Sequence, residues 1–256
     1  MNLRLWVWGI AVGASILLGV PAVAAPSAIQ ISQGVSQQSG GNAAAAAERA
    51  TEGYQLYQQG TAESLRKAIA KYEEALKLYR EVGDRVGEAA TLNNIGKIHD
   101  DLGGKQKALY YYSQSLPLFR AVGHPAGEAA TLNNIGLVYS DLGENQKALE
   151  YYSQSLPLTR TVGDHRGEAI TLNNIGTVYS QLGEKQKALE YYSQSLPLRR
   201  AVGDRTGEAT TLHNIGSVYS ALGEKQKALE YYSQSLPLRR EVGDRRGEAN
   251  TLNSIG

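Results

Sequence analysis

One polar residue recurs at a spacing of forty residues along most of the chain: the asparagine at positions 94, 134, 174 and 214. Its primary amide offers two hydrogen-bond donors and one acceptor, so it can match a peptide bond without reading the side chain attached to that bond. The positions one helical turn later differ between copies. The asparagines are Asn94, Asn134, Asn174 and Asn214, and the variable positions are Lys97, Leu137, Thr177 and Ser217.

No set of residues in the sequence indicates catalytic chemistry. The chain has no cysteine, which excludes disulfides, thiolate zinc sites and a cysteine nucleophile within it. Its serines lack a histidine and a carboxylate placed as partners. His99, Asp100 and Asp101 adjoin, but three side chains on one helical turn diverge, so we expect a solvated turn and not a metal site. We therefore expect no enzymatic activity, no cofactor and no metal.

The charge balance points to a protein partner and not to nucleic acid. Lys and Arg number 26 against 25 Asp and Glu, so no basic excess favours phosphate binding. The position seven residues after each recurring asparagine also varies. It is acidic in the first two copies and neutral in the last two: Asp101, Asp141, Gln181 and Ala221.

The recurring asparagines belong to a 40-residue sequence repeat whose copies open at Gly87, Gly127, Gly167, Gly207 and Gly247. A fixed period of this size predicts a stacked array of repeats. Each copy holds two apolar stripes at spacings of three and four, which predict two antiparallel helices, A and B. In the copy 127–166 the A stripe is Leu132, Ile135, Tyr139 and Leu142, and the B stripe is Ala148, Leu149, Tyr152, Leu156 and Val162.

Other residues predict how the helices begin, end and approach. Asp164 and its copies are placed to cap helix A, with His124 and Pro125 taking over in one copy. Gly136 inside helix A would let helix B come close, because no side chain stands in the way. Pro157 lies inside helix B, where we expect a bend and not a break. In each Tyr pair, such as Tyr151 and Tyr152, we expect one ring in the core.

These residues carry a resemblance to a known family. Leu132-x-x-Ile135-Gly136-x-x-Tyr139, followed by Ala148-x-x-x-Tyr152, resembles the tetratricopeptide repeat signature, with Leu for Trp and Tyr for Phe. The resemblance implies an all-α fold, a right-handed α-solenoid of antiparallel helix pairs. The period of 40 instead of 34 is similar to the kinesin-light-chain type and to exported tetratricopeptide repeat proteins of cyanobacteria.

In that type, helix A lines a concave groove, and the asparagine before the Leu-Gly position forms a ladder on the backbone of an extended peptide. The resemblance therefore implies that Asn94, Asn134, Asn174 and Asn214 bind peptide and that the variable positions confer selectivity. Ser254 stands at this position in the last copy. The predicted function is a protein-protein interaction scaffold. The simpler alternative is that the asparagines were copied with the repeat and only face water.

A second functional hypothesis follows from similar signal-bearing arrays in cyanobacteria, which are commonly followed by a caspase-like peptidase domain of the CHAT type. The chain would then be the regulatory arm of a larger protein.

The N-terminus predicts export. Arg4, the apolar run 5–20 and the small residues 22–24 are typical of a signal peptide cleaved after Ala24. The alternative is an uncleaved membrane anchor at residues 5–25, and both place the repeats in the periplasm or outside the cell. The predicted segments are a signal peptide (1–24), a flexible linker (25–42), an irregular capping repeat (43–86), four full repeats (87–126, 127–166, 167–206 and 207–246) and a truncated repeat (247–256).

Overall fold

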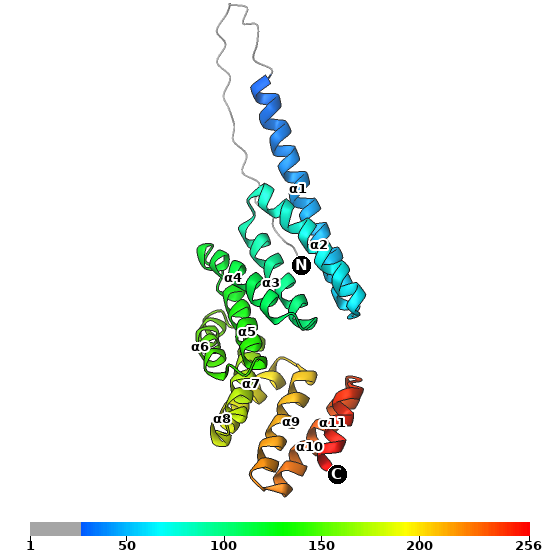
Figure 1. The fold of residues 1–256 in the computed structure, drawn as a ribbon, viewed down its shortest axis with the longest axis vertical. Helices are drawn as coiled ribbons and strands as arrows, with labels where there is room; N and C mark the ends of the chain where they lie inside the picture. Colours follow the sequence, from blue (N-terminus) through cyan, green and yellow to red (C-terminus); the bar gives the residue numbers. More distant parts are fainter. Residues whose placement is uncertain (1–26) are drawn as a thin grey trace, which may run out of the picture. The chain divides into compact units, whose positions relative to one another are not determined.

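The computed structural model describes residues 27–256, which contain helices and no strands (Figure 1). The signal peptide predicted at 1–24 lies outside the described residues. The chain divides at Gly40 into two units, and the repeats form the second, Gly41–Gly256, here called the array. The helices are α1 (Ser27–Gln58), α2 (Ala62–Val82), α3 (Arg85–Asp101), α4 (Lys105–Ala121), α5 (Pro125–Asp141), α6 (Asn145–Thr161), α7 (His165–Gln181), α8 (Lys185–Ala201), α9 (Arg205–Ala221), α10 (Lys225–Glu241) and α11 (Arg245–Ile255).

From α3 onward the predicted A and B helices alternate: α3, α5, α7, α9 and α11 are A helices, and α4, α6, α8 and α10 are B helices. The helices α3, α5, α7 and α9 each contact the B helix of their own copy, and every A helix, α11 included, contacts the helix that precedes it. Successive A helices also contact one another, while no comparable contact joins successive B helices among the described residues. The A helices therefore line the inner side of an α-solenoid, which confirms the predicted all-α fold of antiparallel helix pairs.

The helix ends follow the predicted cap chemistry. Asp164 accepts a hydrogen bond from the backbone N–H of Gly167 at 2.9 Å, and Asp84, Asp204 and Asp244 do the same in their copies. His124 replaces aspartate through Nδ1, which accepts from Gly127, and Pro125 occupies the first turn of α5. Such a cap satisfies one of the backbone donors that a helix start leaves open.

Glycine inside helix A permits the close approach of helix B, as predicted. A Cβ at Gly136 would lie 2.6 Å from the ring of Tyr152, and the equivalent tyrosine of each other copy covers Gly96, Gly176 and Gly216. Tyr152 is fully buried, which confirms that one tyrosine of each pair belongs to the core. The glycine and the tyrosine thus form one packing unit.

Helix B continues through its proline. Pro157 lies inside α6, and Pro117, Pro197 and Pro237 lie inside α4, α8 and α10. The expectation that these residues do not break the helix is confirmed. Each B helix and its C-cap residue are then followed by a glycine in the left-handed region, such as Gly163 at φ 69°.

The core repeats with the sequence. One cluster joins Ala148 and Tyr152 of α6 to Ile175 and Val178 of α7, and equivalent clusters lie on either side. Leu142 and Val162 were predicted to belong to the apolar stripes, and this is wrong: they are 40% and 39% exposed. Both residues are the C-caps that follow α5 and α6, where the chain leaves the helix and its buried face.

The flexible linker predicted at 25–42 also differs from the structure, in which α1 begins at Ser27. No proline lies within Ser27–Gln58, and the alanine run 43–47 has high helix propensity, so the helix can extend back into the polar segment. Further along, Leu56 and Tyr57 of α1 pack on the cluster that contains Tyr72 of α2.

Candidate functional site

The predicted asparagine ladder lies along the inner side of the array and is tied together by its own hydrogen bonds. Nδ2 of Asn174 donates to Oδ1 of Asn133 at 3.2 Å, one copy earlier. Nδ2 of Asn134 donates to Asn93 at 3.2 Å, and that of Asn214 donates to Asn173 at 3.4 Å. All four predicted asparagines are half-buried. Three of the four ladder residues, Asn134, Asn174 and Asn214, are therefore held in one orientation from copy to copy.

A second asparagine row, at Asn93, Asn133 and Asn173, was missed by sequence reasoning. Oδ1 of Asn173 also accepts from the hydroxyl of Thr211 at 3.1 Å, and Oδ1 of Asn133 accepts from Thr171 at 3.3 Å. One amide oxygen thus receives two donors from the next A helix. The signal available in the sequence was the repeated Asn-Asn doublet, of which only the second member was considered.

These bonds leave part of each ladder amide for a ligand. A primary amide has two N–H groups and an acceptor oxygen, and Asn134 and Asn174 each use one N–H within the described structure. The remaining N–H and the oxygen match the C=O and N–H of an extended peptide backbone. Because the first N–H is already fixed, the free groups are pre-oriented, which lowers the entropic cost of binding.

The four variable positions divide into three exposed side chains and one internal contact. Lys97, Leu137 and Ser217 are exposed, whereas Thr177 is half-buried and accepts a hydrogen bond from the hydroxyl of Tyr192 at 3.1 Å. Lys97 lies over the ring of Tyr57, 5.5 Å from its centroid. Thr177 therefore supports the fold as well as lining the inner face.

The acidic positions at the far end of the A helices are partly engaged. Asp141 pairs with Lys105, and Lys105 also donates to Asp100 at 2.8 Å. Asp101 is exposed. Two copies later, Asp is replaced by Gln181 and Ala221, so the charge of the inner face changes along the array.

His213 replaces asparagine in the second row of the fourth full copy. Its Nδ1 lies 3.2 Å from the hydroxyl of Thr251, which preserves the link to the next A helix. Burial, together with the positive charge of Arg239, lowers the pKa of His213 below its ordinary value. The ring lies 5.2 Å from that of Tyr232. His213 is therefore the titratable residue in the second row, whose other members are the neutral asparagines Asn93, Asn133 and Asn173.

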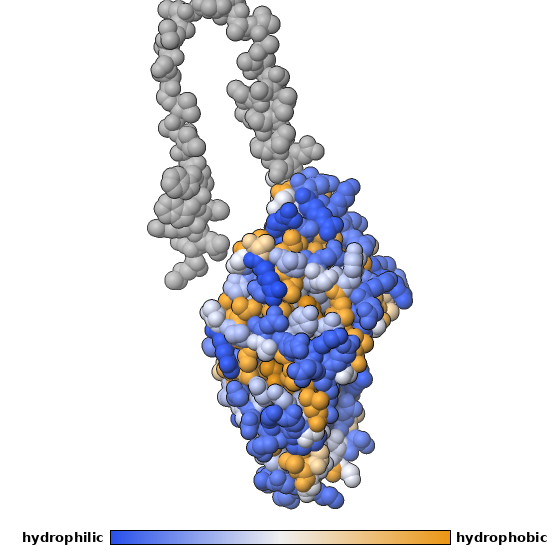
Figure 2. Space-filling view, turned by 60° about the vertical axis from the view of Figure 1, so that its left-hand side comes forward, coloured by the Kyte–Doolittle hydropathy of each residue, from blue (hydrophilic) through white to orange (hydrophobic). Residues whose placement is uncertain are grey.

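A cavity opens beside the ladder between α5, α6 and α7. Its volume is 240 Å³, and its lining includes Asn133, Asn134, Thr159, Asp164 and Ile170. On the outer side, shallow clefts separate successive B helices. One of 730 Å³ is lined by Leu149, Pro157, Tyr179 and Tyr191, and the two tyrosine rings stack at 5.4 Å. Figure 2 shows that apolar surface on one face is interrupted by hydrophilic side chains.

Residues 27–256 contain no group of three or more His, Cys, Asp or Glu side chains that could hold a metal ion. None of their helices combines the length and apolar character needed to cross a bilayer.

The fold is that of an α-solenoid, and a row of asparagine side chains follows the inner side of its A helices. The family model described as Tetratricopeptide repeat matches residues 61–121, 127–201, 191–241 and 207–256. The chain belongs to the tetratricopeptide repeat family, as its sequence signature predicted.

Solved structures share this fold at low sequence identity. BtubC (BKLC) from P. vanneervenii is 21% identical with a TM-score of 0.63, covering 81% of this chain and 92% of that one. A putative kinesin light chain with nearly identical repeats from Podospora anserina is 14% identical with a TM-score of 0.59, covering 76% and 95%. The Rap conjugation gene regulator of the plasmid pLS20, in complex with the Phr* peptide, is 16% identical with a TM-score of 0.68. The match covers 79% of this chain and 55% of the Rap regulator. A search of curated protein sequences gave no match.

Proposed function

We propose that this protein is an interaction scaffold that binds an extended segment of another protein along the inner side of the array. The observation that carries the proposal is the amide ladder, in which Asn134 and Asn174 are each fixed by one hydrogen bond and keep further groups for a ligand. Bonds to a peptide backbone give affinity with little dependence on sequence. Side chains at the variable positions, Lys97, Leu137, Thr177 and Ser217, then supply selectivity.

The comparisons support a protein or peptide as the ligand. Tetratricopeptide repeats typically serve as non-enzymatic interaction modules, and the family match covers most of the array. The Rap regulator with a related fold is described in complex with a peptide, although this chain spans only about half of it. Nothing in this proposal requires a metal or a cofactor.

Replacing both ladder residues tests the proposal. Peptides are first selected with the wild-type protein from a random library displayed on phage, and the affinity of the best one is measured by fluorescence anisotropy. Asn134→Ala with Asn174→Ala should weaken binding about tenfold or more, since each lost hydrogen bond contributes about 0.5–1.5 kcal/mol. The same change removes two bonds between A helices, so unfolding is measured in parallel and binding is measured well below the unfolding transition.

The matched control is Gln146→Ala with Gln186→Ala. These exposed amides line the outer clefts between B helices and lie away from the ladder. The control should bind the selected peptide like the wild type. Equal affinity in the ladder variant and the wild type would refute the ladder as the binding site.

Export is a second part of the proposal. Residues 1–24 have the pattern of a signal peptide, which would deliver the array to the periplasm or the outside of the cell. Expression of the full chain in a bacterial host, followed by N-terminal sequencing of the exported protein, should find Ala25 first. A retained Met1 on membrane-bound protein would instead indicate the uncleaved anchor.

A further inference from the structure

One position near the end of helix B changes its chemistry from copy to copy. It is occupied by Tyr79, Phe119, Thr159, Arg199 and Arg239 in turn. In four of the five copies a large side chain covers the glycine at the start of the next A helix. Thr159 is shorter and reaches Gly167 only with its methyl carbon, 3.1 Å from a Cβ built there, and the 240 Å³ cavity lies at this point. The cavity is therefore the space that Phe119 or Arg199 fills in neighbouring copies.

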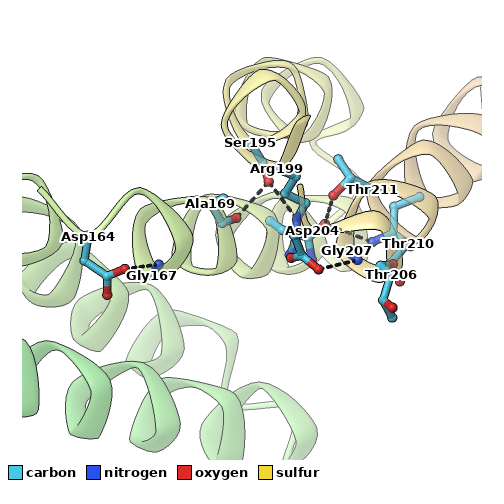
Figure 3. A network of polar contacts seen from close by, with 12 residues as sticks. Asp164, Gly167, Ala169, Ser195, Arg199, Asp204, Thr206, Gly207, Thr210 and Thr211 are labelled. Atoms are coloured by element: carbon cyan, nitrogen blue, oxygen red, sulfur yellow. Dashed lines mark hydrogen bonds and ion pairs between the residues drawn. The ribbon is translucent and has the colours of Figure 1, made fainter. Parts of the chain in front are cut away.

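The two arginine copies show which group that space can hold. Nη1 of Arg199 donates to Oδ2 of Asp204 at 2.6 Å, and its Nε donates to Oγ of Ser195 at 3.3 Å (Figure 3). Arg199 is only 6% exposed, so its guanidinium is enclosed by the array. Arg239 repeats the arrangement with Asp244 and Ser235.

The acceptors of that guanidinium remain in place around the cavity, without the arginine. Asp164 and Ser155 line it, at the positions of Asp204 and Ser195. Oδ1 of Asp164 accepts from the N–H of Gly167, as the cap requires (Figure 3), and no described side chain donates to Oδ2. Oγ of Ser155 donates to the backbone oxygen of Ala129 at 2.9 Å, as Ser195 does to Ala169 at 2.8 Å.

The cavity also opens onto the ladder. Asn133 and Asn134 form part of its wall, together with the apolar side chain of Ile170. A segment that follows the amides along the inner face thus passes a pocket whose wall includes the exposed carboxylate of Asp164.

We propose that this pocket binds the side chain of an arginine in the partner segment, with its guanidinium donating to Asp164 and its alkyl stem lying against Ile170. The inference rests on the proposed function, since it names one residue of the bound segment. Charge-assisted bonds between guanidinium and carboxylate are among the stronger polar contacts of proteins, and they have a defined geometry. The chain's own Arg199 supplies the template for this geometry. The exposed side chain of Arg166 also lines the pocket and opposes a cation there, so Arg166→Ala should strengthen the binding of arginine.

The test uses the full chain and two small probes, N-acetyl-L-arginine methylamide and its neutral isostere N-acetyl-L-citrulline methylamide. Binding is followed through the NMR signal of the Gly167 amide. The arginine probe should shift this signal and bind about three- to fivefold more tightly than the citrulline probe, as expected for an ion pair with an exposed carboxylate. Equal binding of the two probes would overturn the proposal.

Two variants close the pocket from within by using residues that the array already carries at this position. Thr159→Arg and Thr159→Phe should each abolish the shift at Gly167, and both should fold because Arg199 and Phe119 are accommodated by equivalent neighbours. The control Asp101→Asn removes an exposed carboxylate elsewhere on an A helix and should bind the arginine probe like the wild type. Retained binding in both Thr159 variants would also overturn the proposal.

The outcome separates this inference from the proposed function. If selected peptides depend on Asn134 and Asn174 while the arginine probe leaves Gly167 unshifted, the scaffold function stands and the arginine pocket is refuted. If the arginine probe binds but ladder substitution leaves peptide affinity unchanged, the pocket stands and the ladder is refuted.

Discussion

At the scale of single residues, one substitution between copies leaves a buried hydroxyl without a partner. The hydroxyl of Tyr192 donates to Thr177, whereas that of Tyr152 has no hydrogen-bond partner among the described residues. Leu137 stands where Thr177 stands in the next copy. Burial raises the pKa of Tyr152, so its hydroxyl stays protonated and remains a donor in need of an acceptor. An unsatisfied buried polar group costs about 1–3 kcal/mol.

Supplying the missing acceptor should stabilise the protein. Leu137→Thr is expected to raise the free energy of unfolding by about 0.5–1.5 kcal/mol relative to Leu137→Val, which has nearly the same shape and no hydroxyl. The comparison is made by urea denaturation followed by circular dichroism. In a Tyr152→Phe background the advantage of Thr over Val should disappear, and its persistence there would contradict the assignment of the acceptor.

The histidine in the second asparagine row should make stability depend on pH. Burial lowers the pKa of His213 in the folded protein, while an unfolded histidine titrates at about 6.5. As the pH falls below about 6.5 the unfolded chain takes up the proton first, so stability is lost until the lowered folded pKa is reached. His213→Asn, which restores the residue of the other copies, should show a smaller loss of stability between pH 7 and pH 5.

The exposed His165 offers the matched control for that experiment. His165→Asn changes the same residue type on the surface of α7 and should reproduce the wild-type profile. His99, whose pKa burial also lowers, is retained in both variants and gives them a common background. Identical pH profiles for His213→Asn and the wild type would exclude His213 as a source of pH dependence.

At the scale of helices, the glycine inside helix A sets the distance to helix B. Gly136→Ala should destabilise the protein by about 1–3 kcal/mol, because the added methyl group meets the ring of Tyr152 at 2.6 Å. This loss outweighs the gain of about 1 kcal/mol in helix propensity. Gly41→Ala is the control, since no atom lies within 4 Å of its Cβ, and it should be neutral or stabilising. Thermal unfolding of both variants decides the point.

The helices were predictable from sequence because period, caps and stripes all point to the same element. Asp164, Gly136 and Tyr152 each take the predicted role, since these roles depend on local spacing. Leu142 and Val162 were misassigned because an apolar residue at the end of a stripe cannot be distinguished by spacing from one just beyond the helix. The buried bond from Ser155 to the backbone of Ala129 was not foreseen either. It joins two helices of one copy, and sequence spacing gives no distance between their surfaces.

The candidate site was predictable only in part. The period gave the positions of Asn94, Asn134, Asn174 and Asn214, whose role in binding stays a prediction. The bonds from this row to the neighbouring asparagines depend on how far successive A helices lie apart, and a one-dimensional pattern does not contain that distance. The cavity beside Thr159 became visible only when Phe119 and Arg199 were seen to fill the same space.

At the scale of the whole array, stability should depend on complete repeats. Deletion of residues 127–166 joins α4 directly to α7, and the new contact uses the same residue types as the one it replaces. This variant should unfold cooperatively, with unchanged helicity per residue and a smaller dependence on urea, because less surface is exposed on unfolding.

Deletion of residues 127–146 provides the contrast. It removes α5 and leaves α6 without the partner that covers Tyr152, so helicity per residue and cooperativity should both fall. Circular dichroism during urea denaturation measures both quantities. Similar behaviour of the two deletions would contradict a fold made of nearest-neighbour contacts.

The narrow line of amide bonds between successive A helices has a mechanical consequence. Helices within and between neighbouring pairs share broad apolar contacts, whereas the A helices meet each other mainly through pairs such as Asn133 and Asn174. The contacts between successive A helices are then the weakest ones along the array. Pulling on the two ends of the array should lengthen these contacts before any helix unfolds, and a ligand bound across them should make the array more resistant to extension.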